Sequence, residues 1–86
     1  MAVLRLRAPL RGLAGGHREQ PIEGDTVAGS LRELEHKYPE LAGWILDERG
    51  RIRRHINVFV NGERAAEDTP IGTDDRVDVL PAISGG

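Results

Sequence analysis

The stretch INVFVNGE, residues 56–63, decides how this chain folds. Every second residue is apolar, which is typical of a β-strand with one buried face. The residues expected to face the core are Ile56, Val58 and Val60. Asn61-Gly62 follows at once, and this dipeptide favours a tight turn between antiparallel strands because both residues tolerate a positive φ. The stretch therefore predicts a strand, a turn and a short edge strand over residues 63–66.

Upstream, residues 24–40 read GDTVAGSLRELEHKYPE and predict one amphipathic helix. Apolar side chains recur at helical spacing on one face: Val27, Leu31, Leu34 and Tyr38. Asp25 or Thr26 suits the N-cap, and Pro39 ends the helix because a residue before proline is pushed out of the α region. Charged residues occupy the other face, so we expect this helix to pack on a sheet.

The chain begins with a pattern typical of a β-hairpin. Residues 3–8 alternate as a half-buried strand, with Leu4 and Leu6 on the buried face. A glycine-rich turn and a returning strand over residues 17–22 follow. The glycines of the expected turn are Gly12, Gly15 and Gly16.

Two further segments complete the predicted core. Residues 39–46 form a short helical turn that closes one end of the core through Leu41, Trp44 and Ile45. Residues 74–80 form the last strand, which Pro81 ends because it lacks an N–H. Its inward residues are Val77 and Val79, and its outward residues are Arg76, Asp78 and Leu80.

The order of elements predicts an α+β roll. One main helix covers one face of a mixed sheet of about four to five strands, and the other face is open to solvent or a partner. We assign residues 1–81 to this domain and residues 82–86 to a flexible C-terminal tail.

Composition narrows the function. The chain has 86 residues, 38% of them apolar and 30% charged, as expected of a single globular domain. The formal net charge of -2 argues against a nucleic-acid partner. No apolar run is long enough for a membrane span, so we expect a cytoplasmic protein. We also expect the protein to be a monomer when free. The absence of cysteine excludes disulfides and thiolate chemistry.

Motifs for catalysis or metal binding are missing. The histidines His17, His36 and His55 lack metal-ligand spacing, and Asp74-Asp75 has no companion motif. The basic run RGRIRRH, residues 49–55, either steers an acidic partner or is solvated surface, and we favour solvated surface. We expect no autonomous enzyme and no bound cofactor.

Three stretches carry a family resemblance: GDTVAGSLRELEHKYPEL after the hairpin, INVFVNGE, and DDRVDVLPAISGG at the end. Together they resemble the β-grasp fold of ubiquitin-like proteins and, more closely, the sulfur carrier family of ThiS, MoaD and CysO. The chain looks most like the CysO branch.

The resemblance implies a protein co-substrate and its partners. An E1-like adenylyltransferase of the MoeB/ThiF type uses ATP to adenylylate the terminal carboxylate of Gly86. A sulfur donor converts the adenylate to a thiocarboxylate, which delivers sulfur to a biosynthetic synthase. The product could be cysteine, a thiosugar, a thiazole or the molybdenum cofactor.

The tail suits this chemistry. A terminal carboxylate is an anion at neutral pH and resists nucleophilic attack until it is activated. Residues 82–86 reach about 17 Å at most, which allows them to thread a partner's channel. The threading residues are expected to be Ala82, Ile83, Ser84 and Gly85, most of them small.

Tail ordering costs about 1 to 2 kcal/mol per residue, so the domain must also be recognised. We expect a partner to recognise the open sheet face, in a region centred on Phe59 and Leu80. The charged residues around them are Arg5, Arg7, Arg76 and Asp78. The other reading is that Phe59 is merely covered in part by a loop.

Three alternatives remain open. The same Gly86 could form isopeptide bonds as a ubiquitin-like modifier, or the chain could be the small subunit of a molybdopterin synthase. A third reading is a plain interaction domain with an idle tail.

Overall fold

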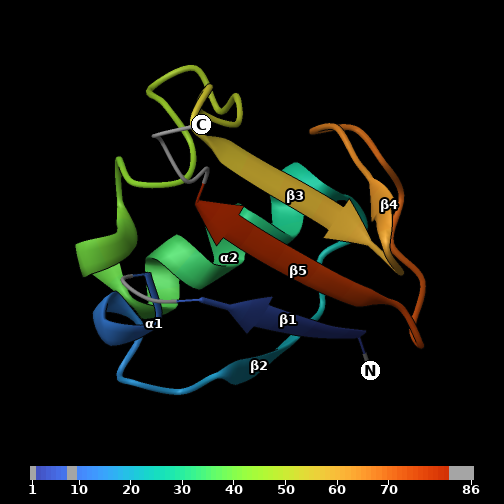
Figure 1. Ribbon diagram of the computed structural model, residues 1–86, viewed down its shortest axis with the longest axis horizontal. Coiled ribbons are helices and arrows are strands. Elements are labelled where there is room, and N and C mark those ends of the chain that lie inside the picture. The colour runs from blue at the N-terminus through green and yellow to red at the C-terminus, as the bar shows by residue number, and fades with distance from the viewer. Residues whose placement is uncertain (1, 8–9, 82–86) are drawn as a thin grey trace.

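The computed structural model describes residues 2–7 and 10–81 (Figure 1). Five strands form one mixed sheet in the order β2-β1-β5-β3-β4. β1 pairs with β5 in parallel, and all other pairs are antiparallel. The strands are β1 (Ala2–Leu6), β2 (Glu19–Ile22), β3 (Ile56–Val60), β4 (Glu63–Arg64) and β5 (Arg76–Pro81). The predicted α+β architecture is confirmed.

The main helix, α2 (Val27–Lys37), lies across one face of the sheet (Figure 1). Three of the four residues of its predicted apolar stripe are fully or almost fully buried, and the fourth, Tyr38, is half-buried. The core residues of α2 are Val27, Leu31 and Leu34, and those of the three central strands include Leu4, Leu6, Val58, Val77 and Val79. The opposite face of β1, β5 and β3 is turned away from α2.

Residues at each end of α2 explain where the helix begins and where it ends. The Thr26 hydroxyl accepts a hydrogen bond from the Gly29 N–H at 3.1 Å, which satisfies one of the free N–H groups of the first turn. At the other end Tyr38 leaves the helical conformation, with φ -128° and ψ 85°, because Pro39 follows it. A short 3-10 turn, η1 (Pro39–Leu41), continues the chain.

The predicted glycine-rich turn is wrong in part. A short helix, α1 (Leu10–Leu13), occupies its first half. Leu10 is only 1% exposed, and its burial holds this helical turn against the core. The turn itself is confined to Gly15 and Gly16, which have φ values of 69° and 81°.

The prediction that Trp44 closes the core is also wrong. Its side chain is 47% exposed, whereas Leu41 and Ile45 are buried as expected. Gly43 has a φ of 86°, and this left-handed turn directs Trp44 outward before Ile45 and Leu46 enter the core. Leu46, which the sequence did not assign to the core, is only 2% exposed.

The turn after β3 matches its prediction. Asn61 and Gly62 both have positive φ values, of 53° and 86°. β5 runs one residue beyond its predicted end, since Pro81 lies opposite Ile56. A proline can still end a strand in this way because its carbonyl accepts hydrogen bonds. Within residues 2–7 and 10–81, no helix is long and apolar enough to cross a membrane.

Candidate functional site

The central strand β5 leads directly into the predicted tail. Its last residue, Pro81, lies opposite Ile56 at the start of β3. Because β1 runs parallel to β5, the end of β1 lies at the same edge of the sheet. The tail residues themselves lie outside the described residues, so their roles remain predictions: Ala82, Ile83, Ser84, Gly85 and Gly86.

The open face of the sheet gathers the charged residues that were predicted to contact a partner. Asp78 lies at its centre, with one carboxylate oxygen 3.6 Å from Arg5 Nε and the other 3.6 Å from Arg76 Nε. Arg5 Nε also lies 3.7 Å from a carboxylate oxygen of Glu19 on β2. The three strands β2, β1 and β5 are thus joined by a chain of ion pairs across this face.

The predicted apolar centre lies beside this chain of ion pairs. Phe59 is directly opposite Asp78, and Leu80 is opposite Asn57. Phe59 and Leu80 are therefore diagonal neighbours on the same face, a geometry that lets large side chains touch. Both side chains are half-buried, so they form a shallow apolar strip and not a fully exposed patch.

One polar contact lies beside the strip, and a further predicted interface residue lies past the end of β1. Arg64 Nη2 on β4 donates a hydrogen bond to Asn57 Oδ1 on β3 at 2.7 Å. Arg64 lies opposite Phe59 in the pairing of these two strands. Arg7 follows β1 directly and is exposed. The structure thus places all the predicted interface residues on or beside one face, and whether a partner binds there remains a prediction.

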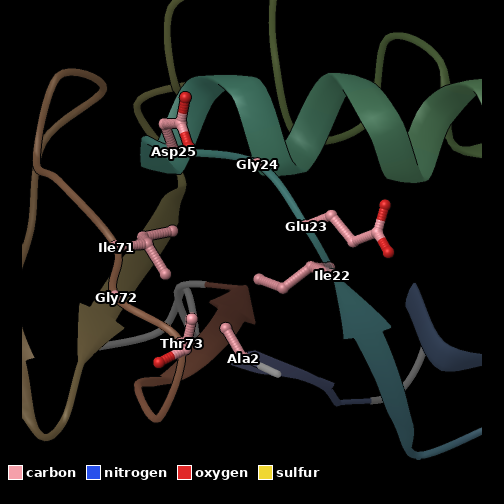
Figure 2. Close-up of a pocket in the computed structure, with 8 residues that line it drawn as sticks. All are labelled: Ala2, Ile22, Glu23, Gly24, Asp25, Ile71, Gly72 and Thr73. Carbon is pink, nitrogen blue, oxygen red and sulfur yellow. The ribbon is translucent and has the colours of Figure 1, made fainter.

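A hollow lies at the end of the sheet opposite to Pro81 (Figure 2). It has a volume of about 270 Å³, and the side chains of Ile22 and Ile71 extend toward one another across it. The Glu23 carboxylate points away from it in the same view. Because β5 begins at this end and reaches Pro81 at the other, the hollow is remote from the start of the tail.

The basic run of residues 49–55 forms an ordered turn. The Asp47 carboxylate accepts hydrogen bonds from the N–H groups of Arg51 at 3.0 Å and Arg49 at 2.8 Å. These hydrogen bonds lower the pKa of Asp47 below its ordinary value of 3.8, and the bond from Arg51 contributes most. The Asp47 contacts thus give this charged loop a structural role.

A mixed five-stranded sheet with one main helix across it, and with the last described strand at its centre, defines the class of ubiquitin-like β-grasp proteins. The match to the ThiS family covers residues 4–86, and the chain therefore belongs to the ThiS family. The sequence-based resemblance to the ThiS, MoaD and CysO carriers is confirmed.

Individual proteins with similar sequences support this family assignment. The chain is 31% identical over 83 residues to sulfur carrier protein CysO of Mycobacterium tuberculosis, covering 90% of this chain and 89% of that protein. It is 33% identical over 84 residues to small archaeal modifier protein 1 of Haloferax volcanii, covering 95% and 97%.

Solved structures share the fold. The crystal structure of Mycobacterium tuberculosis CysO matches with a TM-score of 0.87 and 27% identity over 96% of this chain and all of that one. A chain in the crystal structure of the Amycolatopsis orientalis BexX/CysO complex matches with a TM-score of 0.90 at 24% identity, with both chains fully covered. Small carriers of this family are protein co-substrates, and this chain is one of them rather than an enzyme.

Proposed function

We propose that this protein carries sulfur as a thiocarboxylate on Gly86 and donates it to a biosynthetic enzyme. The observation that carries the proposal is the match to the ThiS family, which continues to residue 86 and thus includes both glycines. The 31% identity to a protein named as a sulfur carrier supports it.

The chemistry proceeds in balanced steps. A carboxylate oxygen of Gly86 attacks the α-phosphorus of ATP, and pyrophosphate leaves. A sulfide ion then attacks the acyl carbon of the adenylate, and AMP leaves with that oxygen. The resulting thiocarboxylate is a soft, anionic nucleophile. An E1-like enzyme supplies the ATP site, since no catalytic constellation is expected in this chain.

In this proposal the domain binds the partner and the tail carries the reacting group. The open face, with the Phe59 and Leu80 strip beside the Asp78 ion pairs, adjoins the strand from which the tail begins. A partner that binds this face can receive residues 82–86 in its active site. The free energy of binding then comes from the domain, because ordering the tail alone costs about 1 to 2 kcal/mol per residue.

Intact-mass measurement tests the proposal. The protein is incubated with ATP, sulfide and an activating enzyme, and a mass increase equal to exchange of one oxygen for sulfur is expected. A variant that lacks Gly86 serves as control and should keep its mass. An unchanged mass for the full-length chain, with an enzyme shown to be active on its own carrier, would contradict the proposal.

Attachment to lysines is a second candidate function. The 33% identity to a protein named as a small archaeal modifier favours it. The same activated Gly86 would then form an isopeptide bond to a lysine amine, releasing AMP. The two functions are separated by the products, because high-mass adducts that survive denaturation indicate a modifier, whereas single sulfur exchange indicates a carrier.

A further inference from the structure

Four arginine side chains line one hollow at the end of β1. They are Arg5, Arg7, Arg11 and Arg18. The hollow has a volume of about 400 Å³, and Leu6 and Asp78 complete its lining. The whole chain carries a net charge of -2, so this hollow concentrates positive charge on a protein that is otherwise slightly acidic.

Backbone hydrogen bonds bring the arginines together. The Leu6 N–H donates to the Arg18 carbonyl at 3.0 Å, which extends the pairing of β1 with the segment before β2. The Arg11 N–H donates to the Arg7 carbonyl at 3.1 Å, and the Gly16 N–H donates to the Arg11 carbonyl at 3.0 Å. The fold of β1, α1 and the turn before β2 therefore fixes the cluster.

The positive charge is only partly balanced. Arg5 shares the carboxylates of Glu19 and Asp78. In the part of the chain that the structure describes, every ion pair within 4.0 Å involves either Arg5 or Arg76. Among the described residues, the guanidinium groups of Arg7, Arg11 and Arg18 thus make no ion pair that would compete with an outside ligand.

The hollow lies next to the strand that leads into the tail. Leu6 is paired with Val79 in the parallel ladder, two residues before Pro81. A protein that holds residues 82–86 is therefore close enough to contact the hollow at the same time.

We propose that this hollow binds an acidic segment of the partner that engages the tail, through at least two Asp or Glu carboxylates. The inference rests on the proposed function, which supplies that partner. Guanidinium groups bind carboxylates in bidentate pairs, and here they come from separate elements along one hollow. An extended run of carboxylates suits this spread better than one compact phosphate, because the arginines lie on and directly after β1, on α1 and before β2.

A peptide titration tests the inference without any enzyme. A hexaglutamate peptide is added to the full chain at low salt while backbone amides are followed by NMR. We expect shifts at Leu6, Arg7 and Arg11. The double variant Arg11→Gln/Arg18→Gln should weaken binding by on the order of tenfold, as expected for loss of hydrogen bonds between charged groups.

A matched control removes the same charge elsewhere. The double variant Arg49→Gln/Arg51→Gln alters two exposed arginines outside the hollow and should bind the peptide like the wild type. Equal weakening by both double variants, or shifts outside the hollow, would overturn the inference because net charge alone would then explain binding. Inorganic phosphate that binds the same residues as tightly would also overturn it.

An activation assay separates this inference from the proposed function. With an activating enzyme, Arg11→Gln/Arg18→Gln should raise KM for the carrier about tenfold and leave kcat unchanged. If the wild-type chain is never thiocarboxylated, the proposed function fails while the peptide titration still reports on the hollow. If the wild type is thiocarboxylated and the variant has the same KM, the inference fails alone.

Discussion

Phe59 of β3 lies directly opposite Asp78 of β5 on the sheet face turned away from α2. An aspartate at position 59 would place two carboxylates side by side and destabilise the pairing by about 0.2 to 1 kcal/mol. Phe59→Ser removes the ring without adding that repulsion. We expect it to raise KM for the activating enzyme by about 10- to 100-fold, the cost of losing an interface anchor.

Val3→Ser is the matched control for Phe59→Ser. Val3 lies on the same face, but two strands away on β1, and is also half-buried. Steady-state thiocarboxylation with circular dichroism as a check of folding compares the two variants. Equal KM values for both would show that Phe59 does not contact the partner.

Gly85→Val should block the tail chemistry without changing the domain. A branched side chain next to Gly86 would displace the reacting carboxylate in a narrow channel, and a shift of about 1 Å can cost about 100-fold in rate. Intact-mass kinetics measure the yield of thiocarboxylate. Ala82→Val changes a tail residue farther from the carboxylate and should have a smaller effect. A normal rate for Gly85→Val would argue against a narrow channel.

Leu31 of α2 is completely buried against the sheet. Leu31→Ala should lower the free energy of unfolding by about 2 to 5 kcal/mol, because it removes buried apolar groups and leaves a cavity. Urea denaturation measures the change. His36→Ala, at an exposed position of the same helix, should stay within about 0.5 kcal/mol of the wild type. Similar losses for both variants would contradict the assigned faces of α2.

Thr26→Ala should destabilise the fold by about 1 kcal/mol, because the Gly29 N–H loses its hydrogen-bond acceptor. Thr26→Ser keeps the hydroxyl and should retain most of the stability. Thermal unfolding compares the three proteins. If Thr26→Ser were as unstable as Thr26→Ala, the methyl group and not the cap would be responsible.

Asp75 makes stability depend on pH. Its carboxylate accepts hydrogen bonds from the Gly72 N–H at 2.7 Å and from the Asn61 side-chain amide at 2.9 Å. These two hydrogen bonds lower the pKa of Asp75 below its ordinary value of 3.8. The bond from Gly72 contributes most, and the bond from Asn61 comes second. A carboxyl group with a lowered folded pKa stabilises the fold above its unfolded pKa. That contribution is lost as the pH falls through the folded pKa.

Asp75→Asn should therefore be less stable than the wild type at neutral pH, and the difference should shrink below about pH 3.8. Urea denaturation at several pH values measures this convergence. Asp74→Asn alters the exposed neighbour and is the control. A difference that stays constant down to low pH would contradict the role of the Asp75 carboxylate.

The strands and α2 could be predicted because their apolar residues follow a simple period. Residues 56–63 show this best, since alternation and Asn61-Gly62 specified the strand, its buried face and its turn. α1 was missed because a glycine within it suggested a turn, whereas burial of the single side chain of Leu10 outweighs the low helix propensity of Gly12. Trp44 was misplaced because hydrophobicity alone does not reveal the backbone reversal at Gly43.

The candidate site was predictable in part. Alternation along β1, β3 and β5 placed Phe59 and Leu80 on one face. The ion pair between Arg5 and Asp78 depends on strand order, which alternation does not specify. Arg11 and Arg18 were missed because alternation reveals neither α1, where the Arg11 N–H bonds to the Arg7 carbonyl, nor the pairing of β1 with the segment that contains Arg18.

The position of β5 has a consequence for synthesis. β5 is the last described strand to leave the ribosome, yet β1 and β3 are joined only through it. The sheet consequently stays in two halves until β5 has left the ribosome, and a nascent chain that stalls before β5 cannot assemble the face that we propose a partner binds. Assembly of the open face therefore waits for the last described strand.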